Sequence, residues 1–380
     1  MTHAFTLNTF PLQRVHFGKC VREALNAEID QIGARRVFIA TSKTLRNETS
    51  ALSLIASTLG NKCIAIFDSI IEHSTLDSAF QALLAAKSTR ADLLVGVGGG
   101  SIVDALKIVQ LGLAEKTHTI DDLLSLSHSR STSEHLIRQI AIPTTLSGAE
   151  ATAAASGTDS SRGVKLGFIN PNLAPCAIIY DPALGALTPE WLWRSSAICG
   201  LDHCCEGFLA RNCSPIAEAG LLHGLRLFAS SLRRTKLVPG DPFARAESQM
   251  ASYVASANAF KAGFGASHGI GYILGARYGL HHGDASCIML PHVLKWNEKE
   301  THIRQRQLSI AMNRPLMSAS EAVSELVSDL ELPSRLRDKG ITHPQLTTIA
   351  KEAATHPVVL TNPRPIQSYE DVLQILEAAW

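Results

Sequence analysis

The sequence has no long apolar run and no excess of charge of one sign. No stretch reaches the roughly 18–20 apolar residues of a membrane-spanning helix, and no basic segment followed by an apolar one opens the chain. The formal net charge is +1 and there is no basic stripe, so neither nucleic acid nor a membrane is an expected partner. Eight cysteines in 380 residues are too few for a disulfide scaffold. We therefore expect a cytoplasmic protein with free thiols.

The first half of the chain alternates short apolar runs with amphipathic stretches. Strands are predicted within 35–44, 62–68, 91–98, 137–145 and 175–188. Strands separated by helical segments predict an α/β fold with a doubly wound parallel sheet. Long helical stretches then follow at 193–212, 214–234 and 243–276. We predict an α/β dinucleotide-binding domain over residues 1–180, an all-α catalytic domain over residues 181–380 and a ligand cleft between them.

A strand that ends in three consecutive glycines is the strongest local signal. The glycines at 98–100 follow the apolar run 93–97 and permit close approach of the backbone to a ligand. Ser101 is expected to cap the following helix, with Asp104 three residues later. Such a strand–loop–helix presents free N–H groups to a phosphate, and a purely structural turn with a capped helix fits the same pattern.

Histidines and a cysteine recur at helical spacing in the second half. Cys199 and His203 are four residues apart, as are His268 and Tyr272, so each pair shares a helix face. A glycine-rich turn then brings in His282. One thiol and three imidazoles suit a transition metal such as zinc. The same residues also fit a metal-free polar pocket in which Cys199 is a small buried hydrophobic residue.

Together these motifs resemble the iron-containing alcohol dehydrogenase superfamily, and most closely its maleylacetate reductase branch. The resemblance runs almost end to end. It rests on GGGSIVDALK (98–107), PTTLSGAEAT (143–152), KLGFINPNLAPCAIIYDPAL (165–184), HCCEG (203–207), HGIGYILGARYGLHHG (268–283) and NPRPIQSYEDVLQILEAAW (362–380). It implies a dinucleotide-binding domain followed by a helical domain, and hydride transfer from a nicotinamide.

The resemblance also implies which residues bind the cofactor. The glycine loop would cradle the pyrophosphate, and small polar or charged residues would add contacts. These residues are Gly98, Gly99, Gly100, Ser101, Asp104, Thr144, Thr145 and Lys165. Where metal-dependent relatives carry a carboxylate for the adenosine ribose, this chain has Ser42, followed by Lys43 and Arg46. Loss of the acid removes repulsion to a 2′-phosphate, so NADH and NADPH are both expected cofactors.

The catalytic residues implied by the resemblance include two departures from the family. His203, His268 and His282 take the positions of three metal-binding histidines, and Cys199 takes that of an aspartate ligand. Maleylacetate reductases carry a neutral residue there and work without metal, so no metal is expected. The alternative is zinc or iron bound by Cys199 and the three histidines. Tyr272 replaces a histidine near the nicotinamide and can donate a proton.

Three functions stay open on the sequence. The resemblance favours NAD(P)H-dependent reduction of a small activated oxo or enone acid, with conversion of maleylacetate to 3-oxoadipate in aromatic catabolism as the expected reaction. Arg277 is a candidate carboxylate clamp, and Asp202 is expected to point away from the histidines. A metal-dependent alcohol or hydroxy-acid dehydrogenase and a cofactor-binding protein without turnover are the alternatives. The expected partners are a small-molecule substrate and, by family precedent, a second copy in a homodimer.

Overall fold

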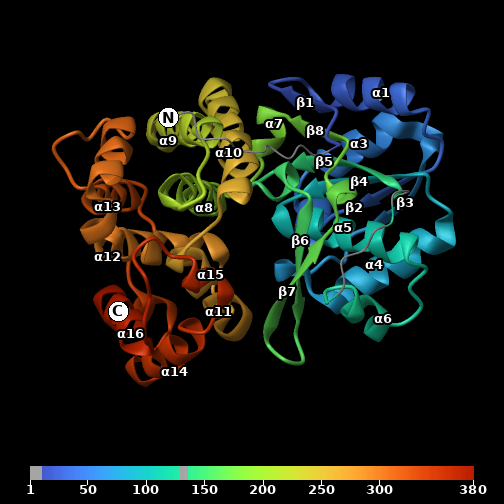
Figure 1. Cartoon of the computed structure of the whole chain (residues 1–380). Helices are drawn as coiled ribbons and strands as arrows, with labels where there is room; N and C mark the ends of the chain where they lie inside the picture. Colours follow the sequence, from blue (N-terminus) through green and yellow to red (C-terminus); the bar gives the residue numbers. More distant parts are fainter. Residues whose placement is uncertain (1–10, 129–132, 134–135) are drawn as a thin grey trace. The chain divides into compact units, whose positions relative to one another are not determined.

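Alternating strands and helices build the first half of the chain, and helices alone build the second (Figure 1). The computed structural model describes residues 11–128, 133 and 136–380. Its chain divides into two units, which we call the sheet unit (Thr9–Thr188) and the helical unit (Pro189–Trp380).

Six parallel strands form the main sheet in the described part of the sheet unit, in the order β1-β8-β5-β4-β2-β3. Their bounds are β1 Arg14–Phe17, β2 Val37–Ala40, β3 Cys63–Phe67, β4 Leu93–Gly98, β5 Arg138–Pro143 and β8 Ala177–Tyr180. Strands β2, β4 and β8 are buried along their whole length, as their continuous apolar runs predict for a sheet covered on both faces. The predicted parallel α/β sheet is confirmed.

Helices cover both faces of this sheet (Figure 1). They are α1 Val21–Ile32, α2 Lys43–Glu48, α3 Ala51–Leu59, α4 Leu76–Thr89, α5 Gly100–Ala114, α6 Ile120–Ser125 and α7 Pro182–Gly185. Successive side chains of a strand point to opposite faces. Val37 and Ile39 of β2 therefore join the core beneath α1 and α3, whereas Phe38 and Ala40 join the core beneath α4 and α5.

A two-stranded antiparallel hairpin, β6 (Ala154–Asp159) and β7 (Val164–Ile169), was not predicted from the sequence. The sequence of β6, AASGTD, is rich in small residues that carry a weak strand signal. Lys107 of α5 ties the start of this hairpin to the sheet unit. Its Nζ donates to the carbonyls of Ala149 at 2.6 Å and Ala154 at 2.8 Å, and to Thr152 Oγ1 at 3.1 Å.

The helical unit contains no strand among its described residues, which confirms the predicted helical second half. Its helices are α8 Glu190–Leu209, α9 Pro215–Leu237, α10 Pro242–Ala262, α11 Ala266–Tyr278, α12 His282–Ala311, α13 Ala319–Asp329, α14 His343–Ala353, α15 Pro357–Leu360 and α16 Tyr369–Ala379. The single stretch predicted over 243–276 is wrong. It is two helices, because Gly263 adopts a φ of 110° and ends α10.

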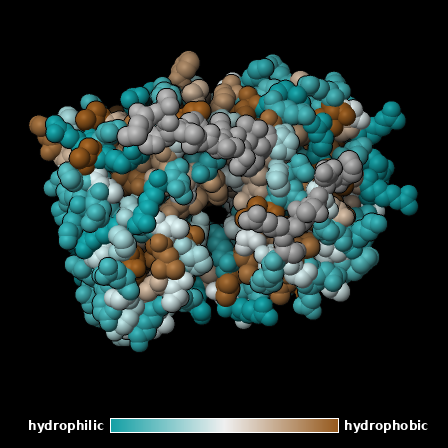
Figure 2. Space-filling model, viewed as in Figure 1, coloured by the Kyte–Doolittle hydropathy of each residue, from teal (hydrophilic) through white to brown (hydrophobic). Residues whose placement is uncertain are grey.

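Membrane-spanning helices and surface hydropathy can both be examined in the described residues. No helix in the described ranges has the length and apolar character needed to cross a bilayer. The face seen in Figure 2 is mostly hydrophilic, and its hydrophobic residues are scattered among polar ones. Isolated apolar side chains of this kind are ordinary for a protein surface.

Lys107 provides a test of the packing around the hairpin. Burial lowers the pKa of its ammonium to about 8, although Asp104 and Glu150 oppose the change. We expect Lys107→Met to lower the free energy of unfolding by about 2 kcal/mol at pH 7, because two partly buried carbonyls lose a donor. Because the folded state binds fewer protons than the unfolded state between pH 8 and 10.5, wild-type stability should rise with pH there relative to the variant. Urea unfolding from pH 7 to 10 measures both effects. Equal stability of the two proteins at pH 7 would contradict the first, and parallel pH profiles would contradict the second.

Candidate active site

Helix α8 carries four chemically important side chains in its buried part. Cys199 and His203 lie one turn apart, and Asp202 and Glu206 form a neighbouring pair with the same spacing. All four residues are at most 4% exposed. Buried polar groups need partners within the protein. The partners of these four side chains lie on α10 and α11.

His268, in the first turn of α11, is the centre of the cluster. Its Nδ1 lies 2.8 Å from Glu206 Oε2, so Nδ1 carries a proton, while Nε2 has no hydrogen-bond partner among the described residues. Burial opposes charging of the ring, but Asp202, Cys199 and Glu206 together raise the pKa of His268 well above its ordinary value. One nitrogen of His268 is therefore committed to Glu206, and the carboxylates of α8 favour the protonated ring.

Asp202 belongs to this cluster, so the expectation that it points away is wrong. Its Oδ2 accepts the Ser267 hydroxyl at 2.6 Å and lies 3.6 Å from His268 Nδ1. The reason is the packing of α11 along the stripe of α8 that carries positions 202 and 206. Burial raises the pKa of Asp202 to about 7, and the Glu206 carboxylate adds to the effect, while the positive charge of His268 opposes it.

His203 is a neutral ring packed against this centre. It stacks on His268 with ring centroids 4.9 Å apart, and Phe264 lies against both rings. Its Nδ1 pairs with Ser256 Oγ at 2.9 Å, and its Nε2 lies 4.0 Å from Cys199 Sγ. Burial and the charge of His268 lower the pKa of His203 well below its ordinary value.

Three of the four predicted metal ligands converge. Cys199, His268 and His282 bring one ligand atom each to within 4.8 Å of one another. A thiolate with two imidazoles is a donor set that zinc accepts. The partnerless Nε2 of His268 is the kind of buried polar atom that a bound ion satisfies. These three residues therefore fit a metal, and His203 is not one of the converging set.

Tyr272 lies next to His282, with nearly parallel rings whose centroids are 5.6 Å apart. Its ring is 6.2 Å from that of His268 and 5.9 Å from that of His356. His356 was not predicted, because it lies in a short segment far along the chain with no recognisable spacing to the other histidines. Its Nδ1 accepts the Val358 N–H at 3.2 Å, and burial lowers its pKa.

Arg277, the predicted carboxylate clamp, is engaged elsewhere. Its side chain is 44% exposed and forms an ion pair with Glu352 at 2.7 Å. A surface arginine with its own carboxylate partner gives no support to a substrate clamp at Arg277.

In the sheet unit, the two predicted cofactor loops lie together at the carboxyl ends of β4 and β5. Gly98 pairs with Pro143, and the Thr144 N–H donates to the Gly98 carbonyl at 3.0 Å. A Cβ on Gly99 would lie 3.2 Å from the Thr145 side chain, and one on Gly100 would lie 2.6 Å from Ser147 Oγ. A side chain at either glycine would therefore force Thr145 or Ser147 to move, and the first N–H groups of α5 have no partner within the helix.

Ser101 and Asp104, two of the predicted cofactor residues, bond to other parts of the sheet unit, and Ser101 does not cap the helix as expected. Helix α5 begins at Gly100 with Gly99 as its N-cap, so Ser101 is not the cap. Its hydroxyl accepts the His73 N–H at 3.1 Å. Asp104 accepts both the N–H and the hydroxyl of Ser156, at 3.1 and 2.8 Å, and so ties α5 to β6.

Ser42 and Lys165 lie on elements separate from the two loops. Ser42 is the N-cap of α2, where its hydroxyl accepts the Leu45 N–H at 3.2 Å, and Lys165 lies in β7. Asp68, which follows β3 and pairs with Arg46 at 2.8 Å, was not predicted from the sequence. This ion pair offsets part of the positive charge near Ser42.

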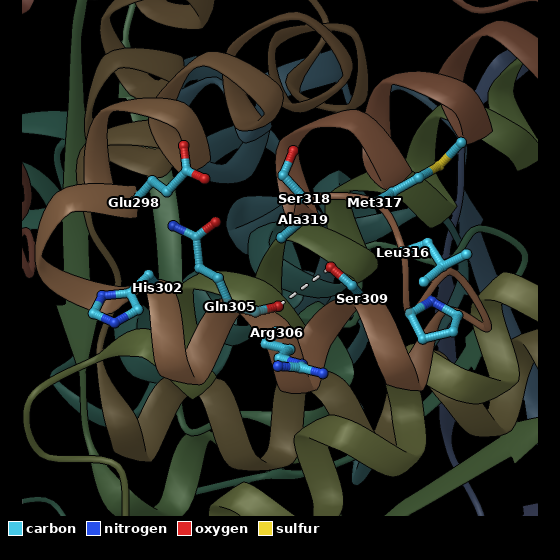
Figure 3. Close-up of a pocket in the computed structure, with 10 residues that line it drawn as sticks. Glu298, His302, Gln305, Arg306, Ser309, Leu316, Met317, Ser318 and Ala319 are labelled. Carbon is cyan, nitrogen blue, oxygen red and sulfur yellow. Dashed lines mark hydrogen bonds between the residues drawn. The ribbon is translucent and has the colours of Figure 1, made fainter.

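A hollow of about 270 Å³ lies elsewhere in the helical unit (Figure 3). Side chains from the second half of α12 and the start of α13 line it, including Glu298, Gln305 and Ser309. None of the predicted site residues is among the described residues that line it. It is therefore separate from the histidine cluster.

Comparison with known proteins covers almost the whole chain. Residues 12–182 match the family profile "Iron-containing alcohol dehydrogenase", and residues 195–380 match the profile for the C-terminal part of the Fe-containing alcohol dehydrogenase family. A dehydrogenase of Alternaria alternata is 30% identical, with 91% of this chain and 99% of the relative covered. Maleylacetate reductase of Burkholderia cepacia is 25% identical, with 96% of this chain and 94% of the relative covered.

Solved structures agree with the sequence matches. The crystal structure of an iron-containing alcohol dehydrogenase from Corynebacterium glutamicum has a TM-score of 0.86 and 26% identity, and the match covers 100% of this chain and 97% of that one. The resemblance to the iron-containing alcohol dehydrogenases is thus confirmed. The chain belongs to the iron-containing alcohol dehydrogenase family of oxidoreductases.

Proposed function

We propose that the protein reduces a small activated oxo or enone carboxylic acid with NADH or NADPH. The observation that carries this proposal is the buried imidazole of His268, held through Nδ1 by Glu206 at 2.8 Å with Nε2 unpartnered among the described residues. A fixed donor in a water-poor site stabilises negative charge that develops on a substrate oxygen.

The sheet unit supports binding of a dinucleotide. The closely packed loops after β4 and β5 leave backbone N–H groups at the start of α5 for a pyrophosphate. Ser42 in place of an acid admits a 2′-phosphate, and Lys43 adds positive charge. Because Arg46 is paired with Asp68, its charge does not by itself favour a 2′-phosphate, and we propose both NADH and NADPH as cofactors.

The proposed chemistry needs one hydride and one proton. A bound reduced nicotinamide supplies the hydride. Its addition to a carbon of the substrate's C=C bond moves that bond's electron pair toward the conjugated ketone oxygen, which gives an enolate. His268 Nε2–H donates a hydrogen bond to the enolate oxygen. Tyr272 Oη–H then protonates the neighbouring carbon, the ketone re-forms, and Tyr272 takes a proton back from solvent.

Maleylacetate is the substrate that we propose, with 3-oxoadipate as the product. It is a conjugated oxo acid, so its reduction passes through the enolate that a buried cationic donor stabilises. A maleylacetate reductase is among the relatives that match end to end. Cys199 offers no hard oxygen ligand at the position where metal-dependent relatives carry an aspartate, which favours a reaction that depends on His268.

Turnover of chelator-treated protein tests this proposal. We expect purified protein to oxidise NADH or NADPH when maleylacetate is added and to do so equally well after metal removal, because His268 supplies the positive charge. The nicotinamide absorbance follows the reaction, and the ratio of kcat/KM for the two cofactors gives the preference. Turnover that disappears with the chelator and returns with added metal would contradict the proposed mechanism.

A second candidate function is a metal-dependent alcohol or hydroxy-acid dehydrogenase. It is favoured by the convergence of Cys199, His268 and His282 within 4.8 Å. An ion held by these residues would polarise a substrate carbonyl or alkoxide oxygen as a Lewis acid. In that case Glu206 and Asp202 would orient His268 from behind, as carboxylates commonly do for metal-bound imidazoles.

Metal content separates the two candidates. If the second candidate is right, the protein takes up about one zinc ion per chain, and Cys199→Ala abolishes this uptake. Cys205→Ala is the matched control, since Cys205 is equally buried on the same helix but is not one of the converging residues. Elemental analysis after dialysis measures zinc, and cobalt substitution reports a thiolate ligand through its charge-transfer absorption. Metal-free wild-type protein would reject this candidate.

A further inference from the structure

Helix α11 begins inside the protein without a cap of its own. Its N-cap residue is Gly265, which has no side chain to accept the free N–H groups of the first turn. Two side chains from distant parts of the sequence take over this task. Glu206 accepts the N–H groups of Gly265 at 2.9 Å, Ser267 at 2.8 Å and His268 at 3.2 Å, and Asn362 Oδ1 accepts that of Ala266 at 3.2 Å.

Glu206 differs from Asn362 because it also holds the His268 ring. Its Oε2 lies 2.8 Å from His268 Nδ1, so one carboxylate that is 4% exposed receives four donors. A carboxylate has about four acceptor sites, so Glu206 is fully used. Its negative charge also lies at the positive end of the helix dipole, which stabilises the ionised form there.

No other described carboxylate takes the place of Glu206. Asp202 Oδ2 is 3.6 Å from His268 Nδ1, which is beyond hydrogen-bond distance, and it accepts the Ser267 hydroxyl instead. A side chain on Gly265 would block the arrangement, since its Cβ would lie 2.9 Å from Glu206 Oε1 and 2.8 Å from Asn362 Oδ1. The missing side chain at 265 is what lets both caps reach the helix.

We propose that Glu206 is a positioning residue that sets the direction of the His268 ring. Glu206 accepts hydrogen bonds from the backbone of the first turn of α11 and from Nδ1 of the ring. It therefore fixes the ring relative to α11 and leaves Nε2 as the only ring nitrogen available to a substrate. This inference rests on the proposed role of His268 in stabilising the substrate oxygen. Asn362 serves the same helix end without touching the ring, so the chain contains its own control.

The experiment compares Glu206→Gln with Asn362→Ala in the full-length protein. A neutral amide at 206 removes the negative charge that faces Nδ1, and its single oxygen cannot serve the donors of both Oε1 and Oε2, so the Nδ1–H donor loses its charged acceptor whichever way the amide turns. We expect Glu206→Gln to lower kcat by about 10²-fold, since misplacement of a reacting group costs this much, with little change in the cofactor Kd. Asn362→Ala should lower the midpoint of thermal unfolding but keep kcat within a few-fold of wild type.

Proton NMR gives a readout that does not depend on turnover. The His268 Nδ1–H should give a strongly downfield, slowly exchanging signal in wild-type protein, which His268→Gln removes and which identifies it. We expect this signal to disappear in Glu206→Gln and to persist in Asn362→Ala. A wild-type protein without the signal would overturn the proposal even if neither variant folds. Equal losses of kcat in both variants would also overturn it, whereas an intact signal in an inactive wild type would reject only the proposed function.

Discussion

The hydrogen bond between Glu206 and His268 is the interaction on which the site depends. One buried carboxylate closes the N-terminus of α11, holds Nδ1 of the histidine at 2.8 Å and helps to keep the ring charged. Without it a buried helix end would have several unsatisfied donors, and the ring would have no reason to present Nε2. The end of the helix and the direction of the His268 ring therefore depend on the same carboxylate. The neutral His203 and the aromatic Phe264 pack against the ring and restrict it further.

In the sheet unit, strand register and two side chains of α5 hold the predicted cofactor loops in place. The register of β4 and β5 places Gly98 opposite Pro143, so the glycine loop and the Thr144–Thr145 loop contact each other at the carboxyl ends of the strands. In open α/β sheets this is the edge at which ligands bind. Lys107 and Asp104 then anchor α5 to the segment from 149 to 156, which keeps the start of the helix in place.

The sequence predicted the regular parts well and the contacts between distant segments poorly. Continuous apolar runs predicted the strands, and i, i+4 spacing predicted the pairing of Cys199 with His203, because both depend on local periodicity. Asp202 was misjudged because the neighbour that decides its role, His268, is 66 positions away along the chain. His356 and Asn362 were not found for the same reason. The break at Gly263 and the helix start at Gly100 depend on backbone angles that composition alone leaves open.

In the reaction that we propose, the imidazole of His268 stabilises the negative charge that develops on the substrate oxygen. The most direct test of this role is the single-turnover rate of hydride transfer in chelator-treated His268→Gln protein at saturating cofactor. His302→Gln is the control, since His302 lines the separate hollow of Figure 3. We expect the rate to fall by about 10²–10³-fold in His268→Gln, with cofactor binding unchanged, and to stay at the wild-type value in His302→Gln. Hydride transfer at the wild-type rate in His268→Gln would contradict it.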